Sequence, residues 1–506
     1  MATRDSILPI SQNPSVTTGL MWAPLSLPTG ESAISAPALP NRNPVIRRRT
    51  PSLGTAPMMG LPVPNMRMTS DRPTRTSSAV PISSDANICQ GKSGALRSFI
   101  AHAPSRGDGT PPIQLRQRRA SLRLAWALIA CVGCAPVRPP VPPSPAEPRL
   151  AVYVGTYTGS GSRGIYRFEL DPASGAWTDP VLAGESENPS FLALHPNGRV
   201  LYAVNELGTF GGEATGAVSA FAIDGAPGNL TPLGQQASGG ADPCHLAVDR
   251  GGRNVLVANY SSGSVAVLPI GSDGRLKPAS SVHRQVGAGP DKARQEGAHA
   301  HAIVLDSAER FALAADLGAD RIFVYRLGAA TGNLEPNDPE AAALEPGSGP
   351  RHLAWHPSGA FLYAINELRS TVTALRFDAG RGALDSFQTI TTLPPGFSGP
   401  NTAAEIAVSP DGRFLYGSNR GDESIAVFKV DAATGALAPA GHFPTGGRTP
   451  RHFAIDPSGH WLLAANQDSD SIAVFRLDPS TGRPVPVGRP LAISKPVCIL
   501  FASPPR

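Results

Sequence analysis

Short apolar segments recur along residues 150–506, and many of them are followed by a turn that contains proline and glycine. Such segments predict β-strands, because proline and glycine favour tight turns and interrupt strands. The turn has the form x-Pro-x-Gly at His195-Pro196-Asn197-Gly198, His356-Pro357-Ser358-Gly359, Ser409-Pro410-Asp411-Gly412 and Asp456-Pro457-Ser458-Gly459. Degenerate copies stand at Asp249-Arg250-Gly251-Gly252 and Asp306-Ser307-Ala308-Glu309.

These turns mark an internal repeat, since successive copies begin 54, 57, 50, 53 and 47 residues apart. A second strand follows each turn and ends at Asn205, Asn259, Asp316, Asn366, Asn419 or Asn466. Further strands complete each copy, as in Val265-Ala266-Val267-Leu268 and Ile472-Ala473-Val474-Phe475. A period of about 50 residues built only of short strands is typical of a β-propeller with four-stranded blades.

Six copies are complete, and the seventh is divided between the two ends of residues 150–506. Residues 151–156 and 164–168 supply its second and third strands, and residues 496–501 supply its first strand. Pairing the two ends in one blade closes the ring and leaves no long strand edge exposed. The sequence therefore predicts an all-β fold, a seven-bladed β-propeller closed by N-terminal strands that pair with the C-terminal strand.

The preceding residues have no such pattern. Residues 1–115 are rich in proline, serine, threonine and arginine, which predicts disorder or an extension upstream of the true start, and we favour the second. Residues 116–134 join a basic run to a short apolar run, the order of a signal segment. There Leu128-Ile129-Ala130-Cys131 resembles a lipoprotein box and predicts lipidation at Cys131, with a fortuitous apolar stretch as the alternative. Residues 135–149 form a proline-rich linker.

Charge and cysteine content narrow the class of protein. Residues 1–149 hold 17 Lys and Arg against 6 Asp and Glu, whereas residues 150–506 hold 27 against 33. The predicted propeller is therefore acidic, and we expect no nucleic-acid partner. The five cysteines form no metal pattern or disulfide framework, and Cys244 and Cys498 lie in apolar strands where we expect them to be buried.

Candidate functional residues stand at repeated positions whose residue type changes from blade to blade. Near the start of the first strand the series is Ser190, Cys244, His301, Arg351, Ala404, Arg451 and Val497. After the second strand the series is Tyr157, Glu206, Tyr260, Leu317, Glu367, Arg420 and Gln467. Antiparallel pairing brings both series to the same face, around a solvent-accessible channel mouth. Three arginines, a histidine and two glutamates at this mouth could bind and process an anionic carbonyl compound.

Each of these positions also has a purely structural explanation. The repeated asparagines would satisfy backbone groups of turns. His245, His352 and His452 share one column with Phe191 and Glu405, and would be hydrogen-bonded packing residues. Arg351 and Arg451 both follow proline and precede histidine, so either could be a relic of the repeat. An arginine paired with Glu367 could be an ordinary structural ion pair.

Several motifs in order resemble the seven-bladed lactonases, which include propeller-type 6-phosphogluconolactonases and fungal carboxy-muconate lactonising enzymes. The matching stretches are Tyr153-Val154-Gly155-Thr156-Tyr157-Thr158, Val257-Ala258-Asn259-Tyr260, His299-Ala300-His301, Gly349-Pro350-Arg351-His352, Tyr363-Ala364-Ile365-Asn366-Glu367-Leu368 and Ser418-Asn419-Arg420-Gly421. The resemblance covers residues 150–506 and none of 1–149. It implies a catalytic group of His301, Arg351, Glu367 and Arg420. The candidate substrate-binding residues are Glu206, Tyr260, His299 and Arg451, and the last of these has no counterpart in the catalytic group of the family.

The resemblance implies hydrolysis of a sugar lactone, with conversion of 6-phospho-D-glucono-1,5-lactone to 6-phosphogluconate in the pentose phosphate pathway as the leading reaction. His301 or Glu367 would act as general base, while Arg351 and Arg420 would polarise the carbonyl and hold the anionic group. We expect no metal or cofactor, because the histidines are scattered among blades without a carboxylate triad. No Gly-x-Ser-x-Gly signature of a serine nucleophile is evident.

Two other functions fit the same residues. One is a non-catalytic propeller, anchored in the cell envelope, that binds a ligand or protein. The other is a lactonising or isomerising enzyme that acts on a carboxylated substrate. If the signal-like segment is used, we expect an envelope lipoprotein, with a lipid anchor as its only contact with the membrane. The protein would otherwise be cytoplasmic, where the phosphorylated lactone is made.

Overall fold

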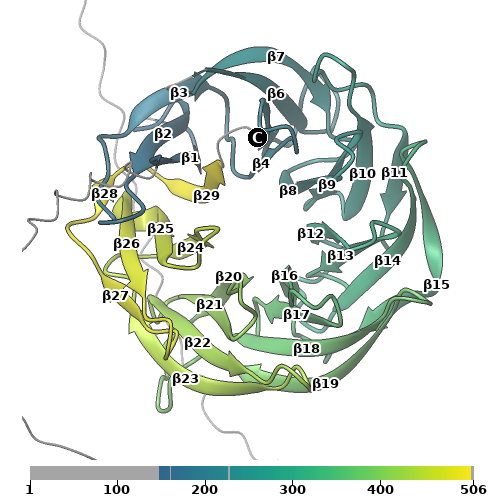
Figure 1. The fold of residues 1–506 in the computed structure, drawn as a ribbon. Coiled ribbons are helices and arrows are strands. Elements are labelled where there is room, and N and C mark those ends of the chain that lie inside the picture. Colours follow the sequence, from purple (N-terminus) through teal and green to yellow (C-terminus); the bar gives the residue numbers. More distant parts are fainter. Residues whose placement is uncertain (1–147, 160, 226–227, 503–506) are drawn as a thin grey trace, which may run out of the picture. The chain divides into compact units, whose positions relative to one another are not determined.

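The computed structural model describes residues 148–159, 161–225 and 228–502. Seven antiparallel sheets stand around a central channel, and the strands nearest the channel are β4, β8, β12, β16, β20, β24 and β29 (Figure 1). The prediction of a seven-bladed β-propeller with four-stranded blades is confirmed, with one outer strand divided in two. The predicted extension of residues 1–115, the signal-like segment with Cys131 and residues 135–147 of the linker lie outside the described residues.

The blades follow the chain in order, and each runs outward from the channel. Blade 1 contains β4 (Leu192–Leu194), β5 (Val200–Asn205), β6 (Ala217–Asp224) and β7 (Asn229–Ala237). Blade 2 contains β8 (Pro243–Val248), β9 (Asn254–Asn259), β10 (Ser264–Pro269) and β11 (Ser281–Arg284). Blade 3 contains β12 (Ala300–Leu305), β13 (Phe311–Asp316), β14 (Arg321–Gly328) and β15 (Asn333–Ala343). Blade 4 contains β16 (Pro350–Trp355), β17 (Phe361–Asn366), β18 (Thr371–Asp378) and β19 (Ala383–Thr391).

The last three blades include the divided strand and the closure of the ring. Blade 5 contains β20 (Thr402–Val408), β21 (Phe414–Arg420), β22 (Ser424–Val430) and β23 (Leu437–Pro444). Blade 6 contains β24 (Pro450–Ile455), β25 (Trp461–Asn466), the 3-10 turn η1 (Gln467–Ser469), β26 (Ser471–Leu477), β27 (Pro484–Pro486) and β28 (Leu491–Ala492). Blade 7 contains β29 (Pro496–Ala502), β1 (Leu150–Thr156), β2 (Gly164–Leu170) and β3 (Val181–Glu185).

The ring is closed by pairing between the two ends of the described chain. Strand β29 pairs antiparallel with β1, for example Val154 with Ile499 and Val152 with Phe501. The C-terminal strand therefore forms the innermost position of a blade whose other strands come first in the chain, as predicted. Within the part of the chain that the structure describes, no helix has the length and apolar character needed to span a membrane.

The apolar core lies between neighbouring blades. Seven clusters of buried side chains occupy the seven interfaces, each combining strands of two adjacent blades. A recurring tyrosine adds a polar tie, as where Tyr363 Oη donates to the Gly435 carbonyl of the next blade at 2.9 Å. Gly435 has φ +73° and lies so close to Phe361 that a Cβ would approach its ring to 2.5 Å. Glycine is required there by both backbone conformation and space.

Most of the repeated asparagines, with the equivalent Asp316, bond to backbone groups, as predicted from the sequence. All six residues of the column are buried, and Asn419 Nδ2 donates to the Thr392 carbonyl at 2.7 Å. The equivalent Asp316 accepts the backbone N–H groups of His299 and Ala319, both at 2.8 Å. These side chains hold the loops that connect one blade to the next, on the face where the candidate site lies.

Candidate active site

A repeated β-bulge places the first series of candidate residues at the channel. In blade 4, Pro350 pairs with Asn366 and His352 pairs with Ile365, so Arg351 has no partner in the ladder. The same shift leaves His301 in blade 3 and Arg451 in blade 6 as the extra residue. A bulge puts one additional residue into a strand and redirects its side chain. The bulges therefore present different side chains of one repeated position to one site.

A pocket of about 450 Å³ lies at this face of the channel. Six candidate residues from the sequence line it, namely Glu206, Tyr260, His301, Glu367, Arg420 and Arg451. Four further residues line it, namely Tyr157, Cys244, Arg294 and Thr402. The volume suits a small ligand of the size of a sugar derivative. Among the described residues, no group of His, Cys, Asp and Glu has the arrangement needed to hold a metal ion.

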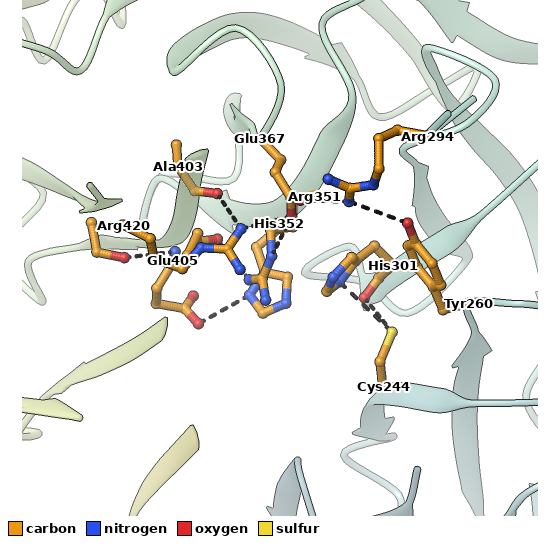
Figure 2. A network of polar contacts seen from close by, with 12 residues as sticks. Cys244, Tyr260, Arg294, His301, Arg351, His352, Glu367, Ala403, Glu405 and Arg420 are labelled. Atoms are coloured by element: carbon orange, nitrogen blue, oxygen red, sulfur yellow. Dashed lines mark hydrogen bonds and ion pairs between the residues drawn. The ribbon is translucent and has the colours of Figure 1, made fainter. Parts of the chain in front are cut away.

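Glu367 forms the centre of the charged network. Its Oε2 lies 3.1 Å from Arg351 Nε and 2.9 Å from Arg420 Nη2, while Oε1 lies 2.6 Å from Arg294 Nη2. Figure 2 shows Arg294 and Arg420 on opposite sides of this carboxylate. Burial alone would raise the pKa of Glu367, but the charges of Arg420, Arg351 and Arg294 outweigh it and bring the pKa to about 2. Glu367 is therefore ionised and fully engaged by cations.

The position of Arg351 differs from the prediction. We expected it at a solvent-accessible channel mouth, but only 2% of its side chain is exposed and it does not line the pocket. Its Nη1 donates to the Ala404 carbonyl at 2.8 Å, and its Nε faces Glu367. The Ala404 carbonyl lies on the bulge of blade 5, where it is outside the ladder and can accept this bond. Arg351 therefore supports Glu367 from inside the protein.

Arg451 is the pocket cation with the fewest polar partners. No carboxylate lies within ion-pair distance of its guanidinium among the described residues, and the group stands 5.3 Å from the centre of the Tyr157 ring. Tyr157 in turn donates its hydroxyl to Glu206, at 2.9 and 3.0 Å from the two carboxylate oxygens. A guanidinium without a carboxylate partner can bind an anionic group of a ligand.

His301 is the imidazole in the pocket wall. Burial first, and then the charge of Arg351, lower its pKa well below the usual range, so the ring is neutral at neutral pH. Its Nδ1 lies 3.7 Å from Cys244 Sγ, and burial raises the pKa of that thiol (Figure 2). Cys244 is thus a protonated neighbour of the histidine, and the prediction that it is buried is confirmed.

His299 lies behind the pocket wall. Its ring stacks on Tyr260 with 4.6 Å between ring centres, and its Nδ1 lies 3.1 Å from the Tyr260 carbonyl. Its Nε2 lies 3.2 Å from Glu296 Oε1. The structure therefore places His299 as a support for Tyr260, and it does not line the pocket.

The repeated position that holds His245, His352 and His452 packs deeper in the channel. The rings of Phe191 and His245 lie 4.2 Å apart, and those of His245 and His352 lie 5.2 Å apart. Glu405 Oε2 lies 3.0 Å from His352 Nδ1 and 3.3 Å from His452 Nε2. These contacts support the interpretation of this column as hydrogen-bonded packing residues.

Comparison with known proteins agrees with this architecture. The family model described as Lactonase, 7-bladed beta-propeller matches residues 151–501. The chain is 38% identical over 299 residues to a 6-phosphogluconolactonase of Bacillus subtilis, covering 59% of this chain and 83% of the relative. A 6-phosphogluconolactonase of Formosa agariphila is 35% identical over 314 residues, covering 59% and 84%.

A solved structure gives the same result in three dimensions. The periplasmic gluconolactonase of Pseudomonas aeruginosa is 35% identical, with a TM-score of 0.66, and the match covers 70% of this chain and 99% of that protein. The fold and the overall sequence of residues 151–501 therefore match those of proteins of one family. This chain belongs to the seven-bladed β-propeller lactonases.

Proposed function

We propose that this protein is an enzyme that hydrolyses the cyclic ester of an anionic sugar lactone, with 6-phospho-D-glucono-1,5-lactone as the leading substrate. The observation that carries the proposal is a neutral histidine beside several arginines in one small pocket. The relatives from Bacillus subtilis and Formosa agariphila, both named 6-phosphogluconolactonase, support the choice of substrate.

His301 is the better candidate for the general base. Both oxygens of Glu367 contact arginines, and a carboxylate with a pKa of about 2 accepts a proton weakly. The His301 ring is neutral, lines the pocket and can take a proton from water. Burial is the main cause of the low pKa of His301, and the charges of Arg351 and Arg451 add to it. A bound anionic group would offset the contribution of these charges and make the ring a stronger base.

Arg420 and Arg451 line the pocket and can donate to the carbonyl oxygen of the lactone. Attack of water on the carbonyl carbon transfers a proton to His301 and leaves negative charge on that oxygen, which fixed cations stabilise. Collapse of this intermediate breaks the ring C–O bond, and protonated His301 gives its proton to the departing ring oxygen. The product is the open hydroxy acid, and His301 is neutral again.

The location of the protein determines which lactone it meets. The predicted lipidation of Cys131 would place the enzyme in the cell envelope, away from the phosphorylated lactone of the cytoplasm. The relative from Pseudomonas aeruginosa is described as a periplasmic gluconolactonase. An unphosphorylated or differently charged sugar lactone is the substrate that an envelope location favours.

The test is proton release on a panel of 6-phospho-D-glucono-1,5-lactone, D-glucono-1,5-lactone and a carboxylated muconolactone. We expect the wild type to hydrolyse at least one of them and His301→Asn to lower kcat by about 100-fold, the loss typical of a missing general base. His283→Asn is the matched control, since His283 lies on the outer strand β11 and bonds the Leu334 carbonyl. Binding of an anionic lactone without turnover by the wild type would contradict the proposal and favour a binding module.

A further inference from the structure

Arg294 is the one pocket arginine that a loop carries. It lies between β11 and β12, whereas Arg420 and Arg451 belong to strands. Its Nη2 lies 2.6 Å from Glu367 Oε1 and 3.3 Å from Tyr260 Oη. The loop, which connects blade 2 to blade 3, therefore places a guanidinium between Tyr260 and Glu367, on the side of this carboxylate opposite Arg420 (Figure 2).

A buried polar node fixes the backbone of this loop. The neighbouring residue Gln295 is fully buried, and its Nε2 donates to Asp320 Oδ1 at 2.8 Å. Asp320 also accepts the backbone N–H groups of Gly347 at 2.6 Å and Gly349 at 2.8 Å. Gly349 lies two residues before Arg351. One carboxylate thus links the loop of Arg294 to the strand that supports Glu367.

The guanidinium of Arg294 retains unused donors. Both of its side-chain contacts use Nη2, and no hydrogen bond within the described chain involves its Nε or Nη1. A guanidinium has five N–H donors, so three remain. The side chain of Arg294 is 38% exposed, compared with 13% for Arg420 and 2% for Arg351. Among the three arginines that contact Glu367, it is the one that solvent and ligand reach most easily.

We propose that Arg294 is a specificity-determining residue, which binds the anionic substituent of the lactone, a phosphate or a carboxylate, at the outer side of the pocket. This inference rests on the proposed function, because it assigns that substituent to one residue and leaves the carbonyl to Arg420 and Arg451. Glu367 and Tyr260 hold Nη2 before the substrate arrives, so little side-chain freedom remains to be lost on binding.

The test compares substrates within each variant. For Arg294→Ala, we expect the ratio of kcat/KM for 6-phospho-D-glucono-1,5-lactone to that for D-glucono-1,5-lactone to fall on the order of 10- to 100-fold, mainly through KM, as loss of a charge-assisted contact predicts. D-glucaro-1,4-lactone, which carries a carboxylate, provides the second anionic arm. Arg294→Lys should restore part of the ratio, because it keeps the charge without the planar fork of donors.

Arg369→Ala is the matched control. Arg369 is also an exposed arginine in an ion pair, with Glu345 at 3.0 Å, but it does not line the pocket. We expect this variant to keep the wild-type ratio. An unchanged ratio in Arg294→Ala, or an equal fall in Arg369→Ala, would overturn the inference.

A binding measurement separates this inference from the proposed function. Calorimetry with 6-phosphogluconate on the full chain should show binding by the wild type and binding at least 10-fold weaker by Arg294→Ala, on the scale of a lost charged contact. If the wild type turns over no lactone but this difference is present, the proposed function fails and the assignment of Arg294 stands. If lactones are turned over and both proteins bind 6-phosphogluconate equally, the assignment of Arg294 fails alone.

Discussion

Replacing Glu367 with glutamine keeps the shape of the side chain and removes the negative charge that three arginines share. Arg351 then remains buried, 2% exposed, without the carboxylate that lies 3.1 Å from its Nε. Removal of one partner from a buried ion pair typically costs about 3–5 kcal/mol, because the other charge stays desolvated. We therefore expect Glu367→Gln to lower the free energy of unfolding at pH 7 by a few kcal/mol.

The pKa of Glu367 gives a second route to the same magnitude. Its folded-state pKa of about 2 lies below the ordinary value of 4.5, so the carboxylate stabilises the fold above pH 4.5. That stabilisation is lost as the pH falls from 4.5 toward 2, where the folded protein must also take up the proton. At about 1.36 kcal/mol for each pH unit that separates the two values, it amounts to about 3 kcal/mol.

The assay is urea unfolding followed by tryptophan fluorescence, at pH values from 7 down to 3. We expect the difference between wild type and Glu367→Gln to be about 3 kcal/mol at pH 7 and to shrink as the pH falls below 4.5. The control is Glu345→Gln, which breaks an exposed ion pair with Arg369 and should cost less than about 1 kcal/mol. A difference below 1 kcal/mol at pH 7, or one independent of pH, would refute this account of the network.

Two further predictions concern the ends of the propeller. A chain that begins at Leu150 should be soluble and folded by circular dichroism and gel filtration, because the described strands close the ring without earlier residues. A chain that begins at Gly164 lacks β1 and leaves β29 without its partner, so it should aggregate. Expressed in a Gram-negative host from residue 115, the protein should begin at a lipidated Cys131 by mass spectrometry, and an intact N-terminus in the cytosol would contradict this.

Most of the architecture could be predicted because a propeller repeats its signals. The x-Pro-x-Gly turns and the asparagine column recur at nearly constant spacing, so a weak signal in one blade is supported by the others. Pairing of both strand ends on one face then brought His301, Glu367 and Arg420 together, and all three line the pocket. The motif order alone sufficed to indicate the family.

The limits of the sequence have physical causes. A bulge leaves a residue out of the ladder, so the alternation of apolar and polar residues along the strand does not reveal which way its side chain points. Arg351 is such a residue, and its side chain points into the protein interior. Arg294 belongs to a loop and to no repeated column, so comparison of blades could not find it. In the sequence, Arg294 is marked only by its position beside Gln295 and ahead of the His299-Ala300-His301 motif. The importance of that position becomes clear only from the buried contacts of Gln295 in the structure.

The position of β29 has a consequence for synthesis. A ribosome makes β1, β2 and β3 first, but the strand that pairs with β1 on the channel side is made last. Until β29 emerges, the apolar faces that blade 7 shares with blades 6 and 1 lack part of their cover. A nascent chain that stops before Pro496 is therefore an open ring with exposed apolar surface, the kind of surface that chaperones and quality-control proteases recognise.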